Sequence, residues 1–97
     1  MAKTILIVDD SSSLRLVVKL ALNRAGYDVL EAGDGKEGLA QLEKAGKVHL
    51  IVSDVNMPVM DGIAFVTEVK KHPRHKFTPV VMLTTEGQDA KLSLIHI

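Results

Sequence analysis

The 97-residue sequence contains no cysteine and no tryptophan, and only one tyrosine and two phenylalanines. The absence of cysteine excludes disulfides and metal sites with thiolate ligands. Because aromatic residues make up only 3% of the chain, the core must consist of Val, Leu, Ile, Ala and Met side chains. Twelve basic residues balance twelve acidic ones, so no overall charge attracts the chain to nucleic acid or to an anionic membrane. Any function that depends on charge must therefore be local.

Long hydrophobic runs are also missing. The first apolar run, Thr4–Val8, is far too short for a signal peptide and is followed by two acidic residues. No other segment approaches the length of a transmembrane helix. We therefore expect a cytoplasmic protein without a nucleic-acid or membrane partner. A content of 46% hydrophobic and 25% charged residues is typical of one small folded domain, which we place at residues 1–97.

Short apolar runs that favour strands alternate with segments of helical periodicity. The predicted strands are Thr4–Val8, Tyr27–Ala32, Val48–Asp54 and Pro79–Thr84. Between them, three segments predict helices with inward faces formed by Leu14, Val17, Val18, Ala21, Leu22 and Ala25, by Leu39, Leu42 and Ala45, and by Phe65, Val66 and Val69. Alternation of strand and helix with short connections predicts an α/β fold in three layers, a parallel sheet with helices on both faces.

Acidic and hydroxyl side chains stand where the predicted strands end. Asp9 and Asp10 follow the first strand, Asp54 ends the third, and Thr84 and Thr85 close the fourth. Sheets of this kind bind ligands beyond the carboxyl ends of their strands. If the first and third strands are neighbours, three carboxylates crowd one edge of the sheet.

Such crowding needs a compensating partner. Two carboxylates about 4 Å apart repel by roughly 4 kcal/mol at an effective dielectric constant near 20, so one takes up a proton or a divalent cation binds among them. Oxygen ligands without nearby His or Cys select a hard ion, Mg²⁺ before Ca²⁺. Asp34 and Asp61 stand beside glycines and read better as turn or N-cap residues, whereas one cap would not require both Asp9 and Asp10.

A carboxylate beside Mg²⁺ and a strand-end hydroxyl is suited to attack a phosphoryl group. The metal neutralises charge on the transferred oxygens, and positioned donors hold them in line. The product is a phosphoaspartyl side chain. Asp54 is the better candidate for the nucleophile, with Asp9 and Asp10 as metal holders.

Three motifs, "ILIVDDS", "SDVNMPVMDG" and "VVMLTTE", together resemble the receiver domain of bacterial two-component response regulators, particularly the chemotaxis type. The resemblance covers residues 3–91 and leaves residues 92–97 as a non-matching tail. It implies a flavodoxin-like sheet with strand order 2-1-3-4, an order of which chemotaxis receivers are a standard example. It also implies a regulatory phosphoacceptor rather than an enzyme, with a sensor histidine kinase or a small phosphodonor as the source of the phosphoryl group.

The resemblance implies roles for individual residues. Asp54 is the phosphoacceptor and a metal ligand. Asp10 binds Mg²⁺ directly, Asp9 binds it through water, and Asn56 contributes its backbone carbonyl.

The remaining roles concern the phosphoryl group and the loop. Thr84 supplies the switch hydroxyl, and Thr85 donates its backbone N–H to the phosphoryl group. Asn56 and Glu86 occupy the two positions that modulate the lifetime of the phosphoryl group. Pro58 and Gly62 shape the loop.

The family pattern continues beyond this sequence with a fifth strand that ends in Lys-Pro and with a last helix. Lys91 does not match the position of that lysine, so we expect a truncated receiver. We expect the fourth strand to form an open edge and the first helix to be uncovered, which predicts a homo-oligomer, most simply a dimer, through the fourth strand and the uncovered sheet face. For the tail we favour a helix from about Gly87, although "LIHI" also alternates as a strand does.

Three alternatives remain. The chain is a non-signalling receiver fragment that folds by oligomerising and at most binds Mg²⁺, an aspartyl-phosphate hydrolase, or a flavin binder with "SSS" at a helix N-terminus. A hydrolase of the haloacid dehalogenase type needs an Asp-x-Asp motif that "VDDS" does not supply, and adjacent carboxylates would repel a flavin phosphate. The four histidines are scattered and predict neither a metal site nor a phosphohistidine relay.

Overall fold

The computed structural model describes residues 3–55, 59–86 and 91–96, with side chains described as far as Leu83. Strands and helices follow one another in the predicted order, with one further strand at the end. The elements are β1 (Thr4–Val8), α1 (Ser12–Arg24), β2 (Asp28–Ala32), α2 (Gly35–Lys44), β3 (Leu50–Asp54), α3 (Gly62–Lys71), β4 (Val80–Glu86) and β5 (Lys91–His96).

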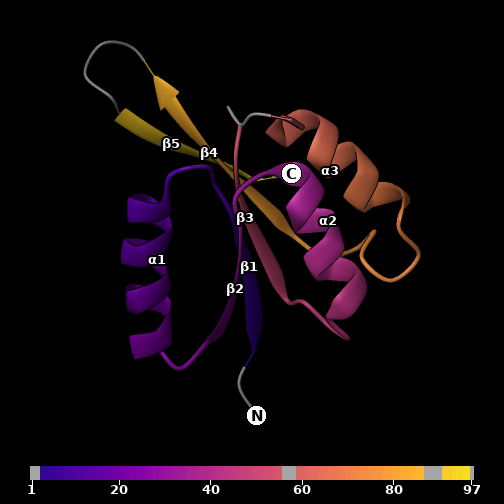
Figure 1. Ribbon diagram of the computed structural model, residues 1–97, viewed down its shortest axis with the longest axis horizontal. Coiled ribbons are helices and arrows are strands. Elements are labelled where there is room, and N and C mark those ends of the chain that lie inside the picture. Colours follow the sequence, from indigo (N-terminus) through magenta and orange to yellow (C-terminus); the bar gives the residue numbers. More distant parts are fainter. Residues whose placement is uncertain (1–2, 56–58, 87–90, 97) are drawn as a thin grey trace.

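The strands form one sheet in the order β2-β1-β3-β4-β5, and the first four are parallel. The predicted order 2-1-3-4 is therefore confirmed. In register, Val8 lies beside Ala32 on one side and Ser53 on the other, and Asp54 lies beside Leu83. Helix α1 covers one face of the sheet, and α2 and α3 cover the other (Figure 1). The carboxyl ends of β1, β3 and β4 thus meet at one edge.

The tail differs from our expectation. Strand β5 pairs antiparallel with β4, with Glu86 opposite Lys91 and Val81 opposite His96. A helix is therefore wrong for Lys91–His96, and the rest of the expected helix, residues 87–90 and 97, lies outside the described residues. The outer edge of β4 offers backbone N–H and C=O groups that a strand can pair and a helix cannot. The expectation that β4 is an open edge is wrong for the same reason (Figure 1).

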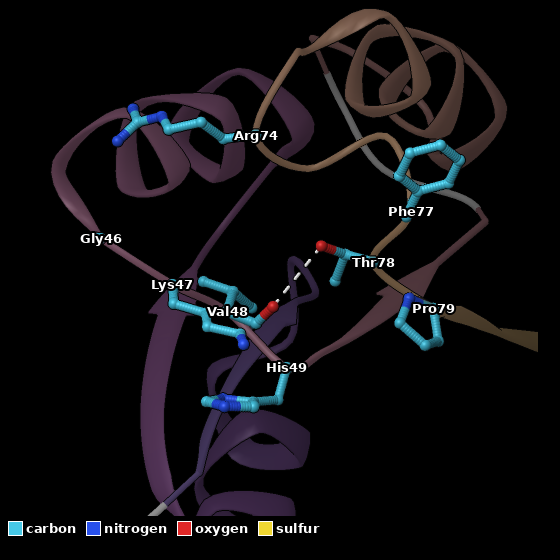
Figure 2. Close-up of a pocket in the computed structure, with 8 residues that line it drawn as sticks. All are labelled: Gly46, Lys47, Val48, His49, Arg74, Phe77, Thr78 and Pro79. Carbon is cyan, nitrogen blue, oxygen red and sulfur yellow. Dashed lines mark hydrogen bonds between the residues drawn. The ribbon is translucent and has the colours of Figure 1, made fainter.

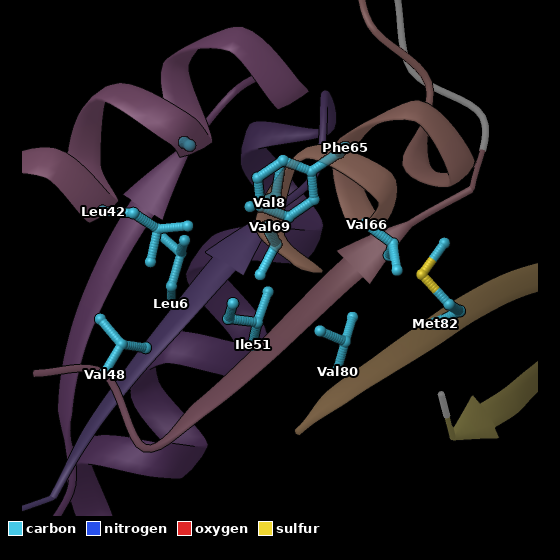
Figure 3. Close-up of a cluster of buried hydrophobic side chains, with 11 residues drawn as sticks. Leu6, Val8, Leu42, Val48, Ile51, Phe65, Val66, Val69, Val80 and Met82 are labelled. Atoms are coloured by element: carbon cyan, nitrogen blue, oxygen red, sulfur yellow. The ribbon is translucent and has the colours of Figure 1, made fainter. Parts of the chain in front are cut away.

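The main hydrophobic core lies between the sheet and the helices α2 and α3. Figure 3 shows Phe65 and Val69 of α3 and Leu42 of α2 directed at strand side chains. The strand side of this core consists of Leu6, Val8, Ala32, Ile51, Val80 and Met82. Phe65, Val66 and Val69 are buried, so the stripe predicted for α3 is confirmed. Leu42 is buried, and Leu39 and Ala45 are partly buried against the core, which confirms the stripe predicted for α2.

The face beneath α1 is packed differently. Ile5 and Ile7 of β1 are buried, but α1 itself has no buried residue. Within the predicted inward stripe of α1, Val17 is 64% exposed. The stripe was therefore predicted too broadly: Leu14, Val18 and Leu22 are half-buried, whereas Val17, Ala21 and Ala25 are exposed.

Side-chain caps mark the start of each helix. The side chains of Ser11, Asp34 and Asp61 accept hydrogen bonds from backbone N–H groups of the first turns of α1, α2 and α3. This confirms the reading of Asp34 and Asp61 as caps. Among the described residues, no helix is long and apolar enough to cross a membrane.

Candidate functional site

Three carboxylates converge at the carboxyl ends of β1 and β3. Asp9 and Asp10 directly follow β1, and Asp54 is the last residue of β3. Because these strands are neighbours in the sheet, one oxygen atom of each carboxylate lies within 4.8 Å of the others. The crowding predicted for this edge is therefore present.

Asp9 is the most buried member of this cluster, with 2% of its surface exposed. Its backbone N–H donates to the carbonyl of Ala32 (3.0 Å), and its Oδ1 accepts from the N–H of Ser11 (2.8 Å). Its Oδ2 is buried and has no hydrogen-bond partner among the described residues. Burial, reinforced by the charges of Asp54 and Asp10, raises the pKa of Asp9 despite the opposing hydrogen bond from Ser11. This oxygen is thus placed for one further partner.

The other two carboxylates are more open. Asp54 is half-buried and Asp10 is exposed, so the cluster is reachable from solvent. A set of carboxylate oxygens with one unsatisfied buried oxygen fits a hard divalent cation. In the part of the chain that the structure describes, no other group of three Asp, Glu, His or Cys side chains is placed to hold a metal. Asn56, the remaining ligand expected from the resemblance, lies outside the described residues.

Gly62, the first residue of α3, packs against the backbone of Asp54 and Val55. The N–H of Gly62 donates to the carbonyl of Val55 (2.9 Å). A Cβ atom at Gly62 would overlap the carbonyl oxygen of Asp54 and lie 2.8 Å from the Cα of Val55. Only glycine allows this close approach of helix and strand. The shaping role expected of Gly62 thus has a steric basis, whereas Pro58 lies outside the described residues.

The loop between β3 and α3 carries backbone strain. Val59 has a φ of 69°, in the left-handed region that β-branched residues rarely adopt. Strain of this kind costs about 1–3 kcal/mol and persists only where the surroundings impose it. On the following residue, the backbone and side chain of Met60 lie so close to Gly35 that a Cβ there would approach them within 3.0 Å. Met60 therefore packs closely against the start of α2.

The last residues of β4 lie at the same edge of the sheet. Leu83 pairs with Asp54, and its carbonyl accepts from the N–H of Val55 (3.2 Å). Thr84, Thr85 and Glu86 continue β4 beyond this pair, opposite β5. Their side chains lie outside the described residues, so the topology places these three positions at the site and says nothing of their side-chain contacts.

Arg15 belongs to the surroundings of the cluster, and the sequence reasoning missed it. Its Nη1 donates to the backbone carbonyl of Asp9 (2.5 Å), and its Nε donates to Glu31 of β2 (3.4 Å). A cation in the first turns of a helix opposes the helix dipole. The presence of an arginine at this unfavourable position was the sequence signal that its side chain has a specific partner.

His72 and His75 have structural partners. The Nε2–H of His75 donates to the carbonyl of Leu42 (3.1 Å), and His72 contacts Glu43 (2.8 Å). Burial lowers the pKa of His75. These contacts join the end of α2 to the connection between α3 and β4.

A separate hollow of about 450 Å³ lies where the connections enter β3 and β4, at the opposite end of these strands from the carboxylates (Figure 2). Figure 2 shows the side chain of Arg74 directed away from Thr78. Arg74 instead donates to the carbonyl of Glu43 (3.3 Å), and Thr78 donates to that of Val48 (3.5 Å). Because Arg74 and Thr78 bond to backbone carbonyls of neighbouring elements, this hollow is a weaker candidate than the carboxylate edge.

Comparison with known proteins identifies the family and several relatives of the chain. Residues 5–95 match the family described as the response regulator receiver domain. The chain is 42% identical over 89 residues to the chemotaxis protein CheY1 of Helicobacter pylori, covering 91% of this chain and 72% of that protein. It is also 38% identical over 82 residues to the sensor histidine kinase CheAY of Helicobacter pylori, covering 84% of this chain and 10% of that protein. The structure of the chemotaxis response regulator CheY4 of Vibrio cholerae matches with a TM-score of 0.85 and 49% identity, over 91% of this chain and 72% of that one.

Proposed function

The chain belongs to the response regulator receiver domain family, and from this premise we propose that it is a phosphoacceptor module in which Asp54 receives a phosphoryl group in the presence of Mg²⁺. The observation that carries the proposal is the cluster of three carboxylate oxygens within 4.8 Å, with a buried Asp9 oxygen that lacks a partner among the described residues. Repulsion among three carboxylates this close favours the binding of a cation between them.

The protein ligands of the cation are Asp10, Asp54 and the backbone carbonyl of Asn56, with Asp9 acting through water. A bound Mg²⁺ supplies charge neutralisation for the phosphoryl oxygens. The donor set agrees with this choice because it offers oxygen atoms alone. Because the protein supplies only two carboxylates besides that of the nucleophile, coordination positions on the cation would remain for phosphoryl oxygens.

In the reaction, an oxygen of Asp54 attacks phosphorus, the bond between phosphorus and the donor breaks, and the donor leaves with the bonding electrons. Thr84 donates its hydroxyl and Thr85 its backbone N–H to the transferred group. Asn56 and Glu86 set how long the acyl phosphate survives. The protein acts as a regulatory phosphoacceptor, and any reaction with a small phosphodonor is autocatalytic.

The physiological donor is the phosphohistidine of a sensor histidine kinase. The 38% identity over 82 residues to a segment of the sensor histidine kinase CheAY of Helicobacter pylori supports this pairing. We also propose that the chain self-associates, through a different surface from the fourth strand predicted above. Since β5 covers the edge of β4, the exposed apolar residues of α1 are the better contact: Leu16, Val17 and Leu20. Light scattering after size exclusion tests it, and a stable monomer contradicts it.

Incubation with Mg²⁺ and acetyl phosphate, followed by intact-mass measurement, tests the phosphoacceptor function. We expect one added phosphoryl group on the wild type and none when Mg²⁺ is chelated. Asp54→Asn is isosteric and should take none, whereas Asp28→Asn removes an exposed carboxylate at the opposite end of β2 and should react as the wild type does. Absence of any mass increase in the folded wild type would overturn the proposal.

A further inference from the structure

We propose that Arg15 is a positioning residue that raises the affinity of the carboxylate cluster for its cation. The inference rests on the proposed function, because it assigns a supporting role within the same site. It starts from the contact between Arg15 and Asp9, which joins the side chain of α1 to the backbone of the metal-binding residues.

The contact acts on the peptide that links two acidic residues. Nη1 of Arg15 donates to the carbonyl oxygen of Asp9 (2.5 Å), and this carbonyl belongs to the planar peptide between Asp9 and Asp10. The same residue is held at its N–H by Ala32 and at its Oδ1 by Ser11. Arg15 therefore fixes the peptide plane from which both acidic side chains extend.

The guanidinium is itself anchored to the sheet. Its Nε pairs with Glu31 (3.4 Å), and Lys19 pairs with the other oxygen of that carboxylate (3.2 Å). The backbone carbonyl of Glu31 accepts from the side chain of Gln41 in α2 (3.2 Å). Only 20% of the Arg15 side chain is exposed, against 39% for Lys19. Arg15 thus connects the end of β1 to β2 through a planar group with several donors in fixed directions.

Two effects of Arg15 on a bound cation oppose each other. Its charge repels Mg²⁺, but Glu31 already pairs with that charge and solvent screens it. Its hydrogen bond orients the ligands, and loss of such an outer contact typically lowers metal affinity about 10–100-fold. Positioning therefore outweighs repulsion. If positioning dominates, removal of Arg15 weakens Mg²⁺ binding. If repulsion dominates, its removal strengthens Mg²⁺ binding.

A calorimetric titration of the full chain with Mg²⁺ distinguishes positioning from repulsion. We expect Arg15→Met and Arg15→Lys each to weaken Mg²⁺ binding about tenfold. Lysine keeps the positive charge but lacks the planar guanidinium that bonds Asp9 and Glu31 at once. The matched control is Lys19→Met, which removes a cation from the same helix and the same Glu31 without a contact to Asp9. It should change the dissociation constant less than about twofold. Thermal unfolding of each variant without Mg²⁺ reports any structural loss separately.

The outcomes distinguish this inference from the proposed function. If the wild type binds Mg²⁺ and is phosphorylated but both Arg15 variants bind within twofold of it, the positioning role is overturned alone. Tighter binding by Arg15→Met with unchanged binding by Arg15→Lys also overturns it, in favour of simple repulsion. A folded wild type that binds no Mg²⁺ overturns both proposals. Should Arg15→Met not fold, Arg15→Lys and Glu31→Gln carry the test, and weakened binding in both supports the inference.

Discussion

The two faces of the sheet are built in different ways. On one face, α2 and α3 bury an apolar core that includes Phe65 and Val69, both 0% exposed. On the other, α1 buries none of its own residues and is joined to the sheet in part by ion pairs of Arg15 and Lys19 with Glu31. Apolar burial contributes roughly 25 cal/mol per Å², whereas ion pairs that solvent still reaches contribute little. The α2–α3 face therefore supplies most of the stability.

The site draws on both faces. Asp54 stands on the well-packed side, where Gly62 at the start of α3 abuts its backbone. Asp9 stands on the polar side, where Arg15 of α1 holds its carbonyl. The comparison implies that changes on the first face alter stability strongly, and that changes on the second alter metal binding more than stability.

The largest effect is expected in the core. Phe65→Ala should lower the free energy of unfolding by about 3–5 kcal/mol, because it leaves a cavity between α3 and the sheet. Leu20→Ala on α1, where the side chain is 52% exposed in the single chain, should change it by less than about 0.5 kcal/mol at protein concentrations at which light scattering shows a monomer. Urea unfolding measures both. Equal losses for the two variants would break the comparison.

A smaller effect is expected where α3 meets Asp54. Gly62→Ala should cost about 1–3 kcal/mol, because its Cβ overlaps the backbone at Asp54 and Val55. It should also slow phosphorylation by displacing Asp54. Gly46→Ala is the matched control, since a Cβ there meets nothing within 4 Å. Unfolding and the rate of reaction with acetyl phosphate should both stay near wild-type values for the control, and a neutral Gly62→Ala would contradict the steric account.

The pH dependence of stability should show the contribution of His75 on the same face. Because burial lowers the folded-state pKa of His75, the unfolded chain binds its proton first. Its stabilising contribution is present above the unfolded pKa near 6.5 and is lost as pH falls from there toward the lower folded-state pKa, with a slope of at most about 1.4 kcal/mol per pH unit. Urea unfolding between pH 7.5 and 5.5 measures this slope. His75→Gln should flatten it, and an unchanged slope would assign it to other groups.

Local patterns predicted most of the fold, and tertiary partners decided the remainder. Thr4–Val8 was predicted residue for residue as β1, because a continuous apolar run suits a strand covered on both faces. The strand at Lys91–His96 was not, since its pairing depends on the free edge of β4. Helical periodicity aligned Val17 with Leu14 without indicating that no neighbour covers it.

The candidate site follows the same division. Asp9, Asp10 and Asp54 were predictable because the carboxyl ends of adjacent parallel strands meet at one edge. Arg15 was not, because its role depends on Glu31, sixteen positions away in sequence. The strained φ of Val59 was also hidden, since nothing in a valine signals the left-handed region.

The central claim is that Asp54 is the phosphoacceptor, and direct location of the phosphoryl group tests it. After reaction with acetyl phosphate and Mg²⁺, borohydride reduces an acyl phosphate to homoserine, which peptide mass spectrometry then places in the sequence. We predict homoserine at position 54 alone, and only when Mg²⁺ is present during phosphorylation. Homoserine at position 9 or 10, or none despite an added phosphoryl group, would contradict the account.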